Sequence, residues 1–445
     1  MSGAGAFMAM LDAAVANLAL ESIRADFAVT LAVVQWVATG YLVALAVSLP
    51  AAAWLGSRYG YGRLWAVSLA GFVATSALCA LAPGPLTLIG ARLLQGLAGG
   101  LMVPTGQAVI GSTAGPRQLG RLMGTLGLAV ALGPALGPAV GGLLLEVASW
   151  RWLFWINVPI GVAALLAARG LVPAGSRDTA RTLDRRGLAL LGIGLPLLLY
   201  GATEIGAAGV TAVTILAVLV GALLAAGFVL AALRAASPLI DLRLLRRKTF
   251  AAAAATAGLT GANMYGRLLL LPLYFQLVAG RDIAETGMLL LAMGLGSALA
   301  LPLAGTLTDR HGAGPVTLAG AGLLVVTVVP FLLPGAFASS GALATLALVL
   351  ILVARGIGMA LAQMPAMTAA YASAAAAEMG DAATLINIVQ RVGGAIGAAG
   401  VVVTLARTGG ADAYGRAFAL LAAVSILTVA SGGLLRRHTR PRAEP

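Results

Sequence analysis

The chain alternates between long apolar runs and short polar connections. Each apolar run is about 20 residues long, the length that an α-helix needs to cross the hydrocarbon core of a bilayer. The runs recur along the whole chain. The pattern predicts about fourteen transmembrane helices, at residues 3–20, 31–55, 65–82, 86–108, 121–145, 152–171, 188–205, 210–233, 251–278, 286–306, 315–334, 342–366, 383–405 and 414–435.

Composition agrees with a protein whose solvent is lipid. Of the 445 residues, 60% are hydrophobic and only 10% are charged, whereas a soluble domain carries about 25% charged residues. Such a chain cannot cover itself with polar surface, so the expected fold class is all-α integral membrane. No basic segment precedes the first apolar run. We therefore expect no cleavable signal peptide, and we expect the natural chain to start upstream with a polar, basic leader.

The basic residues predict the orientation. The formal net charge is +13, with 28 Lys and Arg. With a cytoplasmic N-terminus, nineteen of these residues lie in cytoplasmic loops or tails, five in outer loops and four inside spans. Basic loops stay on the cytoplasmic side, next to anionic lipid, so both termini are expected there. This distribution explains the charge without a nucleic-acid partner, and we expect a monomer.

Polar stretches divide the chain into three parts. The two most polar stretches, 173–187 and 234–249, flank two spans. Six spans remain on each side, which predicts an N-terminal six-helix bundle at 1–172, two extra spans with cytoplasmic segments at 173–249, and a C-terminal six-helix bundle with a basic tail at 250–445. A faint internal repeat supports two related halves, the plan of many secondary transporters.

Five stretches resemble motifs of the major facilitator superfamily, and within it of the fourteen-span drug:proton antiporters. They are LDAAVANLAL at 11–20, ARLLQGLAGGLMVP at 91–104, LGPALGPAVGG at 132–142, SWRWLFWINVPIG at 149–161 and LLLPLYFQLVAG at 269–280. The first departs from the family pattern, which has Thr at Ala14 and Pro at Glu21. The resemblance implies the major facilitator fold, with two six-helix bundles plus two additional central transmembrane helices.

The third of these motifs places poor helix formers inside one of the most apolar spans. The resemblance identifies it as a motif of exporters. Small residues let helix backbones approach closely, and prolines bend a membrane helix. We expect a hinge at the interface of the two halves; the alternative is a kinked packing helix without a hinge role. The hinge candidates are Gly133, Pro134, Gly137, Pro138 and Gly141.

Asp12 is the only carboxylate clearly within a predicted span. An ionisable group at that depth is costly and by default functional, so Asp12 is the candidate proton carrier. The resemblance makes Arg92 its partner in proton coupling. The alternatives are that Asp12 reaches water from the end of a short span, and that Arg92 is a structural residue satisfied by backbone carbonyls.

Polar residues in other spans are candidates for lining a substrate cavity. They are Asn17, Gln95, Arg267, Arg355 and Arg391. Arg355 is the repeat counterpart of Arg92, and a structural role is its alternative. For Arg267 and Arg391 the alternative role is that of an arginine at a helix end that reaches for lipid headgroups. Four span arginines against one carboxylate predict a preference for neutral, zwitterionic or anionic compounds over dications.

Two loop motifs point to gating. In the family the first motif reads Gly-x-x-x-Asp-Arg-x-Gly, but Ser57 stands at the Asp position here, and this weakens the expected latch. The resemblance implies that such an Asp pairs with an Arg and with a helix dipole. The gating candidates in the two loops are Arg58, Gly60, Asp309, Arg310 and Gly312.

These observations predict a transporter without an enzymatic activity. No glycine loop with a lysine for binding phosphate is present, so we expect no cofactor and a proton gradient as the energy source. The expected function is proton-coupled export of hydrophobic or amphipathic small molecules, such as drugs or antibiotics, across a prokaryotic cytoplasmic membrane. The alternatives are a dedicated exporter of one endogenous metabolite or lipid, and a non-transporting membrane sensor on the same fold.

Overall fold

The structure is a computed structural model that describes residues 2–439, except 116–117, 174, 176, 179–180, 209–210, 334–336, 338–340 and 409. All regular secondary structure in these residues is helical. Ten of the helices are long and apolar enough to cross a membrane, or eleven if the bent pair at the N-terminus counts as one span. Each of the fourteen ranges expected from the sequence overlaps a helix or a consecutive group of helices in the described part of the chain.

The helices fall into an N-terminal half, an insertion and a C-terminal half. The N-terminal half contains α1 (Ser2–Leu18), α2 (Leu20–Phe27), α3 (Leu31–Ser48), η1 (Leu49–Ala51), α4 (Ala52–Tyr59), α5 (Tyr61–Ala80), α6 (Pro85–Thr113), α7 (Leu119–Val147), α8 (Trp152–Trp155) and α9 (Asn157–Leu171). The insertion contains α10 (Arg185–Ala208), α11 (Ala212–Arg234) and η2 (Leu242–Arg246). The C-terminal half contains α12 (Lys248–Leu277), α13 (Ile283–His311), α14 (Ala313–Val328), η3 (Val329–Leu332), α15 (Ala342–Ala372), η4 (Ala376–Glu378), α16 (Met379–Thr408) and α17 (Gly410–Thr439).

A glycine turn occurs at the same place in each half. Gly60 lies between α4 and α5 with φ of 92°, and Gly312 lies between α13 and α14 with φ of 83°. Residues with a Cβ rarely adopt this conformation. The glycine therefore ends one span and starts the next within a single residue. These turns are the structural form of the internal repeat seen in the sequence.

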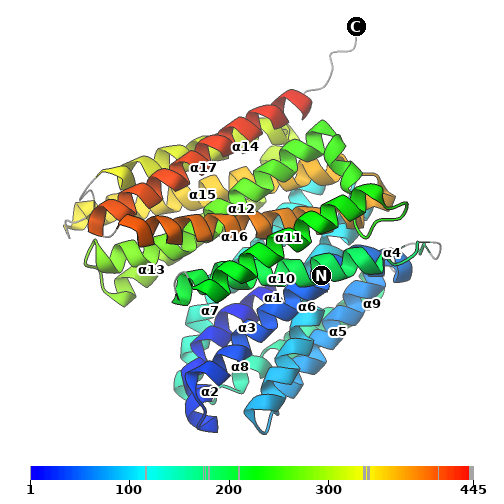
Figure 1. Cartoon of the computed structure of the whole chain (residues 1–445), viewed down its shortest axis with the longest axis horizontal. Coiled ribbons are helices and arrows are strands. Elements are labelled where there is room, and N and C mark those ends of the chain that lie inside the picture. Colours follow the sequence, from blue (N-terminus) through cyan, green and yellow to red (C-terminus); the bar gives the residue numbers. More distant parts are fainter. Residues whose placement is uncertain are drawn as a thin grey trace.

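The two halves meet differently on their two sides. On one side α7 packs directly against α13. Gly120 and Gly124 there lie against the backbone of the other half at Gly305 and Leu301. On the other side α10 lies between α3 and α16, and α11 packs on α10 (Figure 1). The insertion is thus a part of the interface between the halves.

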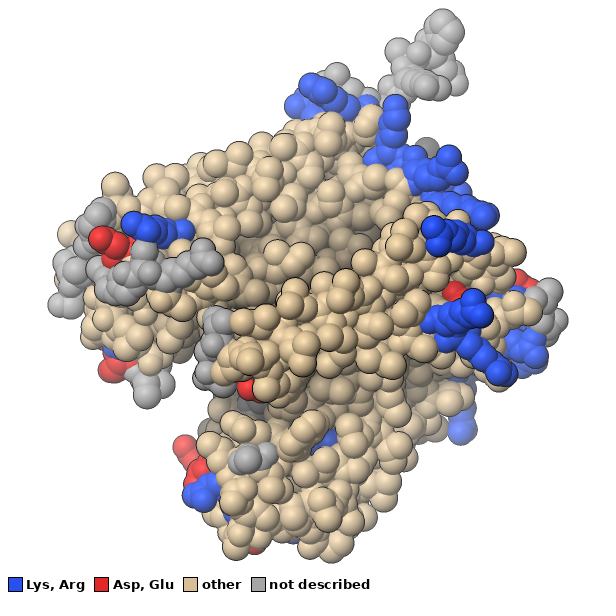
Figure 2. Space-filling model, viewed as in Figure 1, with Lys and Arg blue, Asp and Glu red and all other residues tan. Residues whose placement is uncertain are grey.

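The core connects the halves at one end of the molecule only. Hydrophobic residues of both halves and of the insertion form one large buried cluster there, whereas the other clusters each belong to a single half. That end carries the Gly60 and Gly312 turns and the linker after α9, and we call it the basic end. Lys and Arg gather toward it on the right of the visible face (Figure 2).

Candidate functional site

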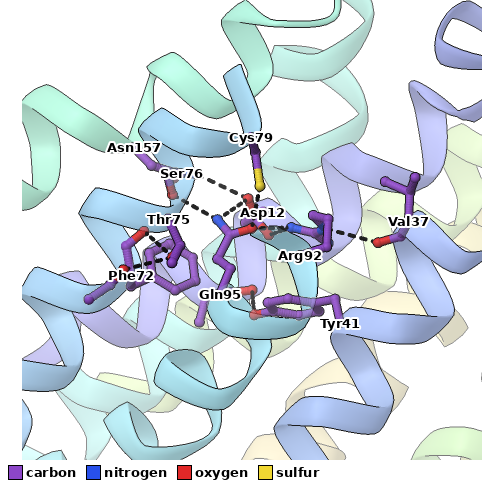
Figure 3. Close-up of polar contacts among 12 residues, drawn as sticks. Asp12, Val37, Tyr41, Phe72, Thr75, Ser76, Cys79, Arg92, Gln95 and Asn157 are labelled. Carbon is purple, nitrogen blue, oxygen red and sulfur yellow. Dashed lines mark hydrogen bonds and ion pairs between the residues drawn. The ribbon is translucent and has the colours of Figure 1, made fainter. Parts of the chain in front are cut away.

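A buried ion pair lies inside the N-terminal half. The Nη1 atom of Arg92 on α6 donates to the Oδ2 atom of Asp12 on α1. Asp12 is 3% exposed and Arg92 is fully buried. These exposures show that Asp12 does not reach water from a span end. Figure 3 shows its contacts with Arg92, Gln95 and Asn157.

Neutral polar side chains hold the carboxylate of Asp12 in place. The amide groups of Gln95 and Asn157 both donate to Oδ1 of Asp12, at 3.1 and 3.0 Å. Gln95 also donates to Ser76 at 2.7 Å. Gln95, expected as a cavity residue, is fully buried and belongs to this cluster. The side chain of Asn17, the other amide expected near Asp12, lies outside the described residues.

Arg92 also has contacts besides Asp12. Its Nε donates to the carbonyl of Val37 at 2.9 Å, and its guanidinium lies 4.2 Å from the centre of the Tyr41 ring. Such cation–π contact suits a desolvated arginine. Arg92 thus has the backbone contact of a structural arginine as well as the carboxylate partner of a coupling residue. Its Nη2 atom has no hydrogen-bond partner within the described protein.

The C-terminal half repeats this arrangement without the carboxylate. Arg355 on α15 is 2% exposed and donates from Nη2 to Oδ1 of Asn263 on α12, at 3.0 Å. The amide of Asn263 in turn donates to Ser425 on α17, at 2.7 Å. Asn263 therefore takes the place that Asp12 has in the N-terminal half.

Arg267 is close to this second arginine cluster. It is 9% exposed, and its Nη1 contacts the sulfur of Met293 on α13 at 3.2 Å. This burial is unlike that of a helix-end residue that reaches for headgroups. Arg391 on α16 is half-buried. Its helix packs against α12 of its own half and also against α10 and α6.

The hinge glycines face a neighbour in their own half. Gly133, Gly137 and Gly141 on α7 lie against Met10, Ala14 and Leu18 of α1. We expected this face at the interface of the halves, and it lies inside the N-terminal bundle because the seam with α13 uses the earlier part of α7. A Cβ at Gly133 or Gly137 would lie 2.6 Å from α1, so close helix approach explains both glycines. The side chains of Pro134 and Pro138 lie outside the described residues.

The two loop motifs differ in their contacts, because one has an aspartate where the other has a serine. The carboxylate of Asp309 accepts hydrogen bonds from the backbone N–H groups of Gly120 and Arg121, both at 2.9 Å. These groups start α7, so Asp309 caps a helix of the opposite half. Ser57 instead donates to the carbonyl of Trp54 in its own helix, at 2.9 Å. Arg58 is half-buried, and Arg310 is exposed.

Sequence reasoning missed the residues that connect the halves beside Ser57. Arg181, in the linker after α9, pairs with Asp381 at the start of α16, at 2.9 Å. Further in, Gln107 on α6 accepts hydrogen bonds from Tyr371 at 3.1 Å and Asn387 at 2.6 Å. Polar residues at the basic ends of apolar spans were the available signal. Their partners lie more than 190 positions away, and no local pattern reveals them.

The helical fold has two related halves, and it encloses an ion pair between two of its membrane-spanning helices. These features define a multi-pass membrane protein of the secondary-transporter class. The family model of the Major Facilitator Superfamily matches residues 3–398. The chain belongs to this family. The fold and family implied by the sequence motifs are therefore confirmed.

Curated relatives and a solved structure agree with this assignment. The chain is 37% identical over 401 residues to the Multidrug resistance protein B homolog of Mycobacterium tuberculosis, covering 89% of this chain and 74% of that protein. It is 32% identical to the Tetracenomycin C resistance and export protein of Streptomyces glaucescens, covering 90% and 74% of the two chains. The solved structure of the proton:xylose symporter XylE matches with a TM-score of 0.66 at 14% identity, over 96% of this chain and 93% of that one.

Proposed function

We propose that the protein is a proton-coupled antiporter that exports hydrophobic or amphipathic small molecules, such as drugs or antibiotics, from a prokaryotic cell across its cytoplasmic membrane. The observation that carries the proposal is the enclosed pair of Asp12 and Arg92, because an ionisable carboxyl group inside the membrane is the simplest proton carrier. The names of the relatives support drug or antibiotic export.

The proton step follows from the contacts of Asp12. Protonation cancels its charge, so Arg92 loses its counter-ion, while Gln95 and Asn157 still hold the carboxyl group in position. A buried arginine without its counter-ion is costly. The cluster therefore favours a different arrangement of α1 and α6 when Asp12 is protonated, and this difference couples the proton to the transport cycle.

The contacts between the halves indicate which state of the transport cycle this conformation represents. In the described part of the chain, the hydrogen bonds and ion pairs that join the halves lie near the basic end. If basic loops are cytoplasmic, this end is the closed cytoplasmic gate, and the conformation faces outward. A cysteine at position 178 then reacts only with reagents that reach the cytoplasm, and labelling from outside would contradict this orientation.

Reconstituted protein tests the proposal. Proteoliposomes with a pH-sensitive dye inside and an imposed proton gradient report proton movement when a candidate drug is added. We expect proton flux that depends on the drug, and uphill drug movement that stops when a protonophore removes the gradient. Drug movement without any response to the gradient would overturn proton coupling.

The second candidate is a dedicated exporter of one endogenous metabolite or lipid. The relative named for tetracenomycin C resistance and export favours it. A panel of unrelated compounds in the same liposomes separates the two, because a multidrug exporter moves several and a dedicated one moves a single class. Binding without movement of any compound would point instead to a non-transporting sensor.

A further inference from the structure

Two buried arginines in the C-terminal half have no carboxylate partner. Arg267 and Arg355 pair with none of the acidic residues that the structure describes. Their contacts are the sulfur of Met293 for Arg267, and Asn263 with the carbonyl of Leu324 for Arg355. All of these acceptors are neutral.

The two positive charges also act on each other. Arg267 follows Asn263, the partner of Arg355, by one turn of α12, so Arg267 and the contact between Asn263 and Arg355 lie on the same face of that helix. A guanidinium does not lose its proton in proteins, so both charges remain. Burying like charges without compensation is unfavourable, and an opposite charge at this place would be correspondingly stabilised.

Residue 263 is the position best placed to supply a negative charge to Arg355, but it is an uncharged asparagine. Asn263 accepts from Arg355 through Oδ1, and its amide nitrogen is fixed by Ser425. Its counterpart Asp12 is a carboxylate that neutralises Arg92. Asn and Asp differ little in shape. The amide at residue 263 therefore leaves the positive charge of the C-terminal half for another group.

We propose that Arg267 and Arg355 form an anion site for the ionised acidic group of the transported compound, so that the preferred substrates are amphipathic monoanions such as organic carboxylates. This inference rests on the proposed transport function and names its substrate class. Guanidinium forks match a carboxylate with two parallel hydrogen bonds, and the buried apolar cluster of Leu324, Met359 and Ala362 on α14 and α15 suits an apolar body. The same charges would also hold an inorganic anion such as chloride.

A matched pair of probes tests the site through binding alone. Pyrenebutyric acid and its methyl ester share one apolar body and differ in one negative charge. Each is titrated against the full-length protein in nanodiscs of zwitterionic lipid, with pyrene fluorescence as the readout, in a dilute zwitterionic buffer without chloride or a competing carboxylate. We expect the acid to bind about tenfold more tightly than the ester, the gain typical of one charge-assisted contact.

Three variants and one control locate the effect. Arg267→Gln and Arg355→Gln should each remove most of the preference for the acid, and Asn263→Asp should do the same by supplying an internal carboxylate. Ester binding should stay within about twofold in all three. Arg416→Gln, at an exposed arginine of the same half, should leave the preference intact. Thermal unfolding of each variant identifies those that fold, and Arg267→Met or Arg355→Met replaces a Gln variant that does not.

Three results would overturn the anion site. The first is equal binding of acid and ester by the unmodified protein. The second is an acid preference that survives in Asn263→Asp and in both Gln variants. The third is displacement of the acid by millimolar chloride without any effect of the acid on transport, which would assign the charges to an inorganic anion. Proton-coupled transport without acid preference refutes this inference alone, and acid preference without proton coupling refutes only the proposed function.

Discussion

The two halves carry the same arginine but different partners for it. In the N-terminal half Arg92 meets Asp12, and in the C-terminal half Arg355 meets Asn263. The last helix of each half supplies a third polar residue, which is Asn157 on α9 in the N-terminal half and Ser425 on α17 in the C-terminal half. The carboxylate of Asp12 compensates the buried arginine of the N-terminal half, whereas the buried arginines of the C-terminal half have no such partner among the described residues. The halves share one arrangement of helices, and the difference at this position is the basis of the separate roles that we propose for them.

Removing the carboxylate of the N-terminal half should have the largest effect. Asp12→Asn makes that half resemble the other, with an arginine beside an amide. We expect uphill export to fall about a hundredfold or to background, because Asp12 is the only acidic residue in the described part of the chain that pairs with a fully buried arginine. Energy-independent exchange should persist, since Gln95 and Asn157 still frame the site. Gradient-driven accumulation and counterflow in the same liposomes measure the two activities, and retained uphill export at neutral pH would show that the proton passes elsewhere.

Moving the carboxylate to the other half should not restore export. The double variant Asp12→Asn with Asn263→Asp keeps the total charge but places it beside Arg355. Ser425, a hydroxyl, there replaces the amide of Asn157, so the support of the carboxylate differs. We expect uphill export below about a tenth of the unmodified level, because groups within one network are not interchangeable. Recovery to half or more would show that either half accepts the proton.

The loops offer a second comparison between the halves. Asp309→Ala removes two hydrogen bonds to the start of α7 and a helix-dipole contact, together about 1–2 kcal/mol. The closed basic end should therefore open about tenfold more often. Reaction of a cysteine placed at Thr384, which is buried near that end, measures the opening. Ser57→Ala is the matched control, and an equal effect of both variants would contradict the difference between the loops.

Restoring the missing carboxylate in the first loop should have the smallest effect. Ser57→Asp recreates the family pattern, but Arg181 already ties that side to Asp381. We expect a change of about twofold in turnover and less in affinity, because the loop is remote from Asp12 and Arg267. Initial rates over a range of drug concentrations separate the two quantities. A change in affinity at constant turnover would contradict this expectation.

The sequence predicted the fold and the individual charges better than their partners. Asp12 and Arg92 stand out because charge is rare in an apolar span. Asn157 does not, since an amide is uncharged and lies 145 positions from the carboxylate that it binds. The position of α10 between α3 and α16 was equally hidden, because its apolar sequence does not tell which surfaces it covers.

The unequal sides of the interface affect how a compound dissolved in lipid reaches the space between the halves. Where α7 touches α13, the wall is one layer of helices and contains glycines. On the opposite side α10 and α11 stand in the way as two further helices. A compound that enters from the bilayer on the first side has to separate only one pair of helices, α7 and α13, whereas on the other side it has to pass α10 and α11 as well. We therefore expect lateral entry to favour the side of α7 and α13.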